Sequence, residues 1–396
     1  MTTPEPSPEI GDQLPAGQPA HNFRSLKELL DFASVKEISK NLDQLGDAGL
    51  AEALPFPFLA LVGQTEMKLA LLLGLINPNI GGILLVGPRG TGKTTAVRSL
   101  LDLLPSIERS TCHYGCQPED IETSGIDAVC PECAQKYAQG TPLTAPDQVR
   151  LVELPLNARL EDVVGGLDER AAVQERMRIR RGILAQADKN LLYIDEINLL
   201  GDDIMDAILD AAAQGLYTVR RGPVAATYRA RFVLIGSMNP EEGKLRPQIL
   251  DRFGLRVIVR GLENNNDRLE AYRRVQAYQS NPRAMINLYA TEIATAREEL
   301  QTARQLLPRV RLPDSLASHA IELIQKMGID SLRAEITWFE AARAYAAAEG
   351  CATVLAAHLA AVAPTALRLR RSSFMTEYFH QQKDEELEMK TLLEQL

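Results

Sequence analysis

Residues 83–101 constrain the fold of this chain more than any other segment. An apolar run at 83–86 precedes the sequence GPRGTGKT at 87–94, and a helical pattern with Ala96, Val97 and Leu100 follows. A glycine-rich loop between a buried strand and a helix brings backbone N–H groups close to phosphate oxygens. The sequence therefore predicts a P-loop that binds a triphosphate.

The predicted phosphate-binding loop has two residues with specific chemical roles. The loop consists of Gly87, Pro88, Arg89, Gly90, Thr91, Gly92, Lys93, Thr94 and Thr95. We expect Lys93 to contact the β- and γ-phosphates and Thr94 to be a ligand of Mg²⁺.

A second apolar run, at 191–194, ends in two acidic residues, Asp195 and Glu196. An aspartate at the end of a strand beside the P-loop strand would complete the Mg²⁺ shell, and the adjacent glutamate would orient and deprotonate the attacking water. The alternative is a buried strand that ends in a solvated acidic turn. We expect both acids to converge with Lys93 and Thr94 on one pocket.

Three further polar residues are candidates for contact with the nucleotide. Asn239 follows a strand at 232–236 and would hold the lytic water or sense the γ-phosphate, although the Asn-Pro pair alone predicts a turn. Arg252 follows a short helix and is a candidate arginine finger, which would stabilise charge on the nucleotide of a neighbouring subunit. The alternative is that Arg252 pairs with Asp251 on a solvated surface loop. Arg333 opens a helix and would reach a phosphate, although most arginines at such positions lie on the surface.

The organisation of the chain indicates several domains. With 396 residues the chain is longer than a domain with a single hydrophobic core usually is, so two or three domains are expected. Residues 1–50 are predicted to form a disordered tail plus a small helical extension, 51–261 an alternating strand and helix core with a mostly parallel sheet, and 262–396 an all-α domain. The expected strands are 83–86, 149–154, 191–194, 231–236 and 255–259. Helices are expected at 65–75, at 284–307, around Leu316–Met327 and from Leu332, and 264–266 is expected to be a linker.

Composition excludes several classes of protein. A net charge of −9 and a pI near 5.3 disfavour a nucleic-acid binder, and Arg220, Arg221 and Arg229 are the only basic candidates for such a role. No apolar run approaches the length of a membrane span, and the first residues lack a secretory signal. Five cysteines in a chain of this length favour a reducing cytoplasm.

Four of the cysteines form two close pairs within a polar insertion at 110–146. The pairs are Cys112 with Cys116 and Cys130 with Cys133. This spacing suits a tetrahedral structural Zn²⁺ site, in which His113 would be able to replace one thiolate. The alternative is a flexible loop with incidental or redox-active thiols. Cys351 is expected to be a small core residue in a helix.

Together these motifs resemble the AAA+ superfamily and, within it, the magnesium chelatase ATPase (I) subunit family. The resemblance spans roughly residues 55–370. It is carried by the P-loop and by FLALVGQTEMK at 58–68, VELPLNARLEDVVGG at 152–166, RGILAQA at 181–187, LLYIDEINLL at 191–200, SMNPEEGKLRPQILDRFG at 237–254 and SLRAEI at 331–336.

The resemblance implies an ATP-hydrolysing motor with a three-layer α/β/α P-loop core, a mostly parallel sheet and an all-α C-terminal domain. By motif, Arg252 matches the arginine finger of the family, Arg333 its sensor arginine, Asn239 its first sensor and 217–231 its hairpin insertion. The family forms rings, commonly hexamers, with ATP between subunits. The expected partners are a subunit with an integrin-like metal-binding domain and a large porphyrin-binding subunit on which Mg²⁺ enters protoporphyrin IX.

Two other functions stay open at this point. A ring ATPase of the same build would remodel another protein complex or serve insertion of a different metal. A nucleic-acid motor is a further alternative, which the acidic net charge disfavours.

Overall fold

The computed structural model describes residues 54–104, 106–167, 179–243 and 245–370. The tail and helical extension expected at 1–50 lie outside these residues, as does the end of the predicted C-terminal domain, 371–396.

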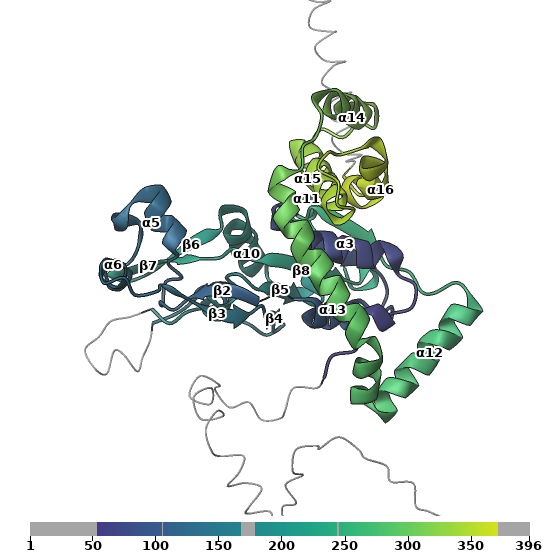
Figure 1. Cartoon of the computed structure of the whole chain (residues 1–396), viewed down its shortest axis with the longest axis horizontal. Helices are drawn as coiled ribbons and strands as arrows, with labels where there is room; N and C mark the ends of the chain where they lie inside the picture. The colour runs from purple at the N-terminus through teal and green to yellow at the C-terminus, as the bar shows by residue number, and fades with distance from the viewer. Residues whose placement is uncertain (1–53, 105, 168–178, 244, 371–396) are drawn as a thin grey trace, which may run out of the picture. The chain divides into compact units, whose positions relative to one another are not determined.

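Five strands form a central sheet in which every pairing is parallel (Figure 1). The strand order is β4 (Leu151–Leu154), β5 (Leu191–Ile194), β8 (Val233–Met238), β1 (Ile83–Val86) and β9 (Leu255–Ile258). All five predicted strands are confirmed, with small shifts at the ends of β4, β8 and β9. Because the strands are parallel, their carboxyl ends share one edge of the sheet, where ligands of such sheets commonly bind.

Both faces of the sheet are covered by helices, which confirms the three-layer α/β/α arrangement. Successive side chains of β1 point to opposite faces, so Ile83 and Leu85 belong to one buried cluster and Leu84 to the other. The first cluster includes residues of α3 (Thr65–Ile76), α4 (Lys93–Ser99) and the 3₁₀ turn η3 (Leu100–Leu103). The second includes residues of α7 (Leu160–Val164), α9 (Ile183–Gln186), α10 (Asp202–Gln214) and α11 (Pro247–Arg252).

The region after the sheet is helical, as predicted. Its helices are α12 (Asn265–Ser280), α13 (Pro282–Leu306), α14 (Asp314–Lys326), α15 (Leu332–Ala348) and α16 (Ala356–Leu367). Trp338 of α15 is 4% exposed, and its indole N–H donates to the carbonyl of Leu359 at 2.8 Å. The first buried cluster runs without interruption from the sheet into these helices. A domain boundary near residue 261 therefore stays a prediction.

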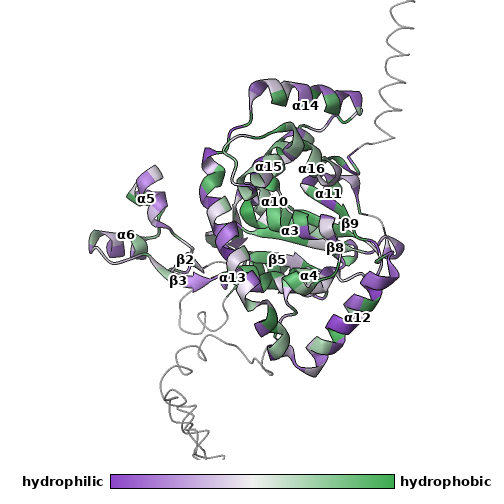
Figure 2. Ribbon diagram, turned by 45° about the vertical axis from the view of Figure 1, so that its right-hand side comes forward, coloured by the Kyte–Doolittle hydropathy of each residue, from purple (hydrophilic) through white to green (hydrophobic). Residues whose placement is uncertain are grey.

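Two expectations for the helical region were wrong. Asn264 does not belong to a linker, because its side chain accepts the N–H of Asn266 at 2.9 Å and caps α12. No residue of α12 is buried, and Figure 2 shows a mostly hydrophilic helix. Cys351 follows the end of α15 and is not helical, although it packs partly buried against the core.

Two insertions extend from the core and lie side by side (Figure 1). The first is an antiparallel pair, β2 (Ser106–Ser110) with β3 (Thr144–Gln148), which carries α5 (Pro118–Ser124), the turn η4 (Ile126–Ala128) and α6 (Pro131–Ala138). The second is the hairpin of β6 (Leu216–Arg221) and β7 (Val224–Arg229). Short 3₁₀ turns occur at η1 (Phe58–Ala60), η2 (Pro78–Ile80), η5 (Ile197–Leu199), η6 (Pro240–Glu242) and η7 (Leu307–Arg309).

None of the described helices is both long and apolar enough to cross a membrane.

A carboxylate at the end of α11 neutralises two buried arginines. The side chains of Arg256 and Arg370 are 1% and 0% exposed, and their guanidinium groups lie 3.6 and 3.2 Å from Asp251. Burial lowers the pKa of Arg256 to about 10; the neighbouring Arg370 adds to this effect and Asp251 opposes it. The hydroxyl of Ser331, before α15, also donates to Asp251 at 3.1 Å. Asp251 thus joins α11 and β9 to the C-terminal helices.

We predict that Asp251→Asn lowers the free energy of unfolding by about 2 kcal/mol, because two buried guanidinium groups lose their counter-charge while the side chain keeps its shape. Urea denaturation measures the effect. Asp330→Asn, at an exposed aspartate for which no ion pair is seen, is the matched control. Equal stability of the two variants would contradict the role of Asp251.

Candidate functional site

The backbone of the glycine-rich loop is shaped for close approach of a ligand. The N–H of Gly87 donates to the carbonyl of Met238 at 3.1 Å, and a Cβ at Gly87 would lie only 2.1 Å from the carbonyl oxygen of Val259. Gly90 and Gly92 have φ angles of +76° and +85°, values that residues other than glycine rarely adopt. Apart from the adjacent residues of the chain, nothing lies within 4 Å of the Cβ position at Gly90 or at Gly92, so there is open space beside the loop where it enters α4.

The ammonium group of Lys93 lies inside this loop. Its Nζ donates to the carbonyls of Gly87 at 2.6 Å and Pro88 at 2.8 Å. Burial lowers the pKa of Lys93, and nearby carboxylates, Asp195 most strongly, oppose that effect. The charge is therefore held at the turn where the predicted phosphates would lie.

Thr94 and Asp195, 101 residues apart, are in contact at the carboxyl edge of the sheet. The Thr94 hydroxyl donates to Asp195 Oδ2 at 3.1 Å, while the hydroxyls of Tyr193, at 2.9 Å, and Ser237 donate to Oδ1. Burial by itself would raise the pKa of Asp195, but the hydrogen bonds from Ser237, Tyr193 and Thr94 lower it below its usual value. An ionised carboxylate beside a hydroxyl is a donor set that Mg²⁺ prefers.

Glu196 lies next to this pair and faces the tip of the loop. Its φ of +49° is uncommon for a residue other than glycine, and such conformations concentrate at functional sites. Its N–H donates to Ser237 Oγ at 3.2 Å, and its carboxylate pairs with Arg89 at 3.2 Å. The carboxylate is 25% exposed, so water can reach it. The structure thus brings Lys93, Thr94, Asp195 and Glu196 together, as predicted.

Asn239 lies at the end of β8 and reaches the same site through an ion pair. Its amide donates to Glu242 Oε1 at 3.1 Å, and that carboxylate lies 2.5 Å from Arg89 Nε. Its own oxygen accepts the N–H of Glu241 at 3.2 Å, which caps η6. The Asn239 side chain therefore forms the turn that the Asn-Pro pair predicts. It is also only 3% exposed and lies beside the predicted catalytic groups.

A cavity of about 430 Å³ adjoins the loop. It is lined by the loop residues Gly90, Thr91, Gly92 and Thr95 and by Phe56, Val62, Met67 and Leu262, among others. Its volume and its apolar walls suit a nucleoside. This cavity was not predicted, because its walls come from three segments that are far apart in the sequence.

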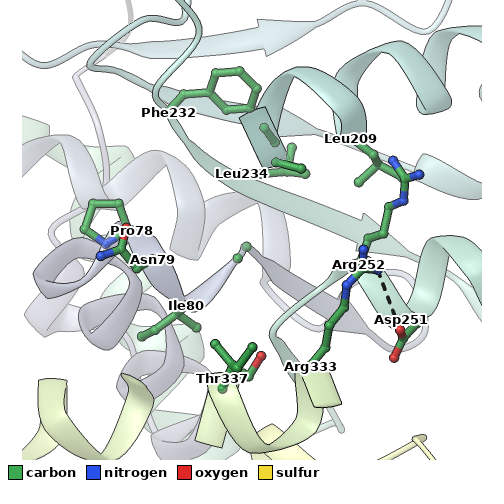
Figure 3. Close-up of a pocket in the computed structure, with 15 residues that line it drawn as sticks. Pro78, Asn79, Ile80, Leu209, Phe232, Leu234, Asp251, Arg252, Arg333 and Thr337 are labelled. Atoms are coloured by element: carbon green, nitrogen blue, oxygen red, sulfur yellow. Dashed lines mark ion pairs between the residues drawn. The ribbon is translucent and has the colours of Figure 1, made fainter. Parts of the chain in front are cut away.

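Arg252 and Arg333 line a different cavity, of about 190 Å³ (Figure 3). Arg252 pairs with Asp210 of α10 at 2.6 Å, and Arg333 lies 3.6 Å from Asp251. The same cavity is lined by Gly81 and Gly82, which precede β1, whereas the P-loop follows β1.

The two arginines therefore lie at the amino edge of the sheet, opposite their own P-loop. Four residues of β1 separate the two edges by about 13 Å. The sequence predicted that Arg252 contacts a neighbour's nucleotide, and it predicted a phosphate contact for Arg333 without indicating whose nucleotide. The structure excludes a direct contact of Arg252 with its own nucleotide site and groups Arg333 with Arg252.

The four cysteines of the insertion form a compact cluster. The sulfur atoms of Cys112, Cys116, Cys130 and Cys133 all lie within 4.8 Å of one another, and sulfurs around a tetrahedral Zn²⁺ are about 3.8 Å apart. The N–H of Cys116 donates to Cys112 Sγ at 3.2 Å. A hydrogen bond from the Cys116 thiol lowers the pKa of Cys112 below its usual value despite burial.

His113 is not part of this cluster, contrary to the alternative ligand set. Its Nε2 lies 3.2 Å from both the Tyr228 hydroxyl and the carbonyl of Ile179. The imidazole therefore faces the hairpin.

Sequence reasoning missed several residues that shape these sites. Ser237 and Tyr193 position Asp195, Glu242 links Asn239 to Arg89, and Asp210 holds Arg252. Ser237 and Asp210 had no local signal, because each contacts a residue 42 positions away along the chain. Tyr193 and Glu242 contact residues two and three positions away, but their local sequence does not show which side chains meet.

The fold and the site define this chain as a P-loop protein of the AAA+ class. Residues 58–248 match the family described as magnesium chelatase, subunit ChlI, and residues 317–391 match the AAA lid domain. The chain belongs to the magnesium chelatase ChlI subunit family.

Similar proteins cover most of the chain. It is 45% identical to the magnesium-chelatase 38 kDa subunit of Acidiphilium rubrum, over 80% of this chain and 90% of that protein. It is 44% identical to the protein of the same name from Cereibacter sphaeroides, over 80% and 93%. It is 41% identical to the magnesium-chelatase subunit ChlI homolog of Methanocaldococcus jannaschii, over 84% and 90%.

Solved structures add to these similarities. A chain in the complex between subunits BchI and BchD of magnesium chelatase is 40% identical, over 83% of this chain and 99% of that one, with a TM-score of 0.45. A crystal structure from Cytophaga hutchinsonii, of a protein proposed to be an ATPase, has a TM-score of 0.50 at 19% identity, over 78% of this chain and 83% of that one. The second likeness concerns the fold alone.

We predict that Glu196→Gln lowers the rate of ATP hydrolysis by about 10²–10⁴-fold, because the amide cannot take a proton from water, while ATP affinity changes little. Lys93→Ala is expected to lose ATP binding as well. Steady-state hydrolysis and equilibrium titration with a fluorescent ATP analogue measure the two effects. Glu241→Gln, at an exposed glutamate of the same edge, is the matched control. A Glu196→Gln protein that hydrolyses ATP at the control's rate would remove Glu196 as the base.

Proposed function

We propose that this chain is the ATP-hydrolysing motor subunit of a magnesium chelatase-type complex. The observation that carries the proposal is the 3.1 Å contact between Thr94 and Asp195, with Glu196 directly beside it. A hydroxyl, an ionised carboxylate and a second carboxylate at the end of a phosphate-binding loop are the groups that hydrolysis of Mg²⁺–ATP requires.

Each group then has a defined role. The loop at 87–95 binds the phosphates and Lys93 neutralises the β- and γ-oxygens. Thr94 and Asp195 would hold Mg²⁺, and the bound ion would supply positive charge at the phosphates. Glu196 orients the attacking water and accepts its proton. Asn239, tied to Glu242, detects the γ-phosphate at the tip of β8.

The positions of the arginines support a ring. Arg252 and Arg333 lie on the opposite edge of the sheet from their own P-loop, so each subunit presents a nucleotide site on one face and two arginines on another. Head-to-tail contact of these faces generates a closed ring, for which we propose six subunits. Arg252 then stabilises charge on the neighbour's γ-phosphate, with Arg333 beside it.

Chelation is supported by the names of the relatives, which are subunits of magnesium chelatase. We propose two partners, a subunit with an integrin-like metal-binding domain and a large porphyrin-binding subunit. On the latter, ATP hydrolysis by this chain would drive entry of Mg²⁺ into protoporphyrin IX. The alternative is a motor of the same build that remodels another protein complex or serves insertion of a different metal.

A nucleic-acid motor is disfavoured by the contacts of the hairpin arginines. Arg229 forms an ion pair with Asp120, and Arg221 donates to the carbonyl of Gly165 at 3.4 Å. Both are therefore engaged within the chain rather than presented to phosphates. We place the protein in the cytoplasm, where the five free thiols would stay reduced.

We also propose that the four clustered thiolates hold a structural Zn²⁺. The sulfur separations suit tetrahedral coordination, and the only other buried apolar side chain of that cluster among the described residues is Leu143. So small a core cannot order an insertion of this length, and a metal supplies the missing stability.

Metal insertion is the direct test of the function. When the chain is mixed with the partner subunits of the same organism, Mg²⁺, protoporphyrin IX and ATP, we predict that magnesium protoporphyrin forms. The fluorescence of the product measures the reaction. The reaction should fail when Lys93→Ala protein replaces the wild type or when ATP is omitted. ATP hydrolysis without metal insertion, in the presence of both partners, would favour the remodelling alternative.

Mixed rings test the placement of Arg252. Arg252→Ala subunits keep a nucleotide site and Lys93→Ala subunits keep the finger, so we predict that neither hydrolyses ATP alone. In an equal, random mixture roughly a quarter of the sites regain both parts, because a head-to-tail ring pairs each site with one neighbour. Recovery of ATP hydrolysis to that level would support the proposal that Arg252 acts on the nucleotide of the neighbouring subunit. No recovery in rings shown to be mixed would contradict it.

A further inference from the structure

The peptide between the first two cysteines of the cluster contacts the hairpin of β6 and β7. The Tyr114 ring stacks on Tyr228 of β7, with centroids 5.8 Å apart and planes at 24°. The His113 ring meets the same tyrosine edge-on at 5.7 Å. Tyr228 is 1% exposed and donates to the carbonyl of Ile179 at 3.0 Å. Tyr228 of the hairpin is thus buried against residues that lie between Cys112 and Cys116 in the sequence.

A second contact joins the same insertion to the next residue of β7. Asp120 of α5 forms an ion pair with Arg229, and the two side chains are only 11% and 21% exposed. Asp120 is oriented by the N–H of Gln117, which donates to it at 2.7 Å. Gln117 directly follows Cys116, so this contact also depends on the placement of a clustered cysteine.

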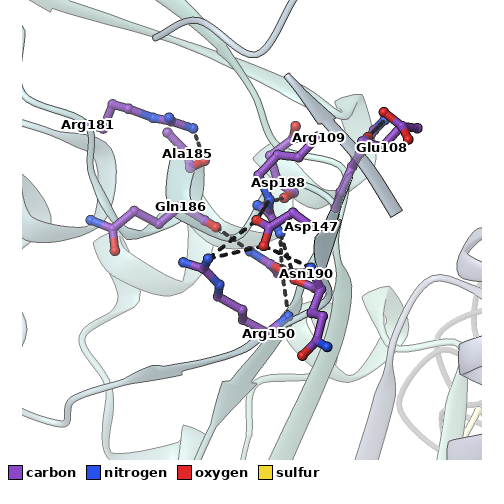
Figure 4. A network of polar contacts seen from close by, with 11 residues as sticks. Glu108, Arg109, Asp147, Arg150, Arg181, Ala185, Gln186, Asp188 and Asn190 are labelled. Atoms are coloured by element: carbon purple, nitrogen blue, oxygen red, sulfur yellow. Dashed lines mark hydrogen bonds and ion pairs between the residues drawn. The ribbon is translucent and has the colours of Figure 1, made fainter. Parts of the chain in front are cut away.

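The base of the insertion is held differently, by side chains that need no metal (Figure 4). Arg109 of β2 pairs with Asp147 of β3 at 2.5 Å and donates to Asn190 Oδ1 at 2.7 Å. It also donates to the carbonyl of Asp188 at 3.3 Å. These contacts tie the base of the insertion to the segment that leads into β5.

The outer part of the insertion lacks comparable support. Its buried apolar residues among those described are Cys112, Cys116, Cys133 and Leu143, with Ile121, Val129 and Cys130 partly buried around them. The sulfur atoms therefore occupy the centre of this small cluster, where apolar side chains would otherwise be needed. A metal there fixes the outer part, whereas the base is already fixed by Arg109.

We infer that zinc at Cys112, Cys116, Cys130 and Cys133 holds the β6–β7 hairpin in place, through Tyr114 and His113 against Tyr228 and through Asp120 against Arg229. An antiparallel pair of strands is marginally stable by itself, so its position depends on what covers it. The face of the hairpin that carries Tyr228 also packs on Ile179 and Ala185, so loss of the metal is expected to loosen the hairpin and not to release it. The inference rests on the proposed zinc site and is independent of ATP hydrolysis.

The test compares backbone hydrogen exchange of the full chain, reduced and loaded with zinc, with the same chain stripped by a chelator. We expect exchange in 224–229 to become about tenfold faster on stripping, since an aromatic stack and a partly buried ion pair together contribute on the order of 1.4 kcal/mol. Exchange in 191–194 and 83–86, in the central sheet, is expected to stay unchanged. Zinc content is measured on the same samples.

Two variants separate the metal from the contact. Cys133→Ser should lose zinc and loosen the hairpin, with Cys351→Ser, outside the cluster, as its control. Tyr114→Ala should keep zinc and still loosen the hairpin, because it removes only the stack; Tyr137→Ala, at an exposed tyrosine of the same insertion, is its control.

The outcomes are distinguishable. Stoichiometric zinc with unchanged hairpin exchange after stripping would overturn the inference and leave the zinc site standing. A chain that binds no zinc would overturn both. Zinc-dependent protection that Tyr114→Ala abolishes supports the inference, whatever the rate of ATP hydrolysis.

Discussion

Parallel pairing of β5, β8 and β1 brings the Thr94 hydroxyl within 3.1 Å of Asp195, and the rest of the site depends on that contact. Because the three strands run in one direction, residues from widely separated segments meet at their carboxyl ends. Ser237, at the end of β8, donates to Asp195 and accepts the N–H of Glu196, so the central strand sets both acidic residues. A slip in register would separate the magnesium ligands from the phosphate loop.

The opposite edge of the same sheet carries complementary groups. Asp251 neutralises Arg256 and Arg370 inside the chain and lies between Arg252 and Arg333, which face a cavity. Asp251, which stabilises the junction with the C-terminal helices, is therefore adjacent in sequence to Arg252, the proposed arginine finger. A change in the position of the C-terminal helices would reach Asp251, the residue directly before Arg252; in the proposed ring this would link the C-terminal helices of one subunit to the nucleotide of its neighbour.

Local sequence patterns predicted the parts of this protein that local chemistry determines. The glycine-rich loop, the five strands, Asp195 and Glu196 were found because each has a short apolar or glycine pattern beside it. The roles of Ser237 and Asp210 were missed because their partners are 42 residues away along the chain. Helix α12 was missed because it buries no residue and so has no apolar face to detect. The cysteine spacing predicted a cluster but not the contact of His113 and Tyr114 with the hairpin, which depends on tertiary packing.

We predict that the two edges of the sheet have different roles: magnesium and phosphates bind at one edge, and the arginines at the other edge, Arg252 and Arg333, reach the nucleotide of a neighbouring subunit. A cryo-EM structure of the assembled protein with Mg²⁺ and a non-hydrolysable ATP analogue measures this most directly. The expected result places the ion between the Thr94 hydroxyl and the phosphates, with Asp195 beside it, and the guanidinium of the adjacent subunit's Arg252 at the γ-phosphate. Nucleotide bound away from Thr94, or an interface that leaves Arg252 in solvent, would contradict the account.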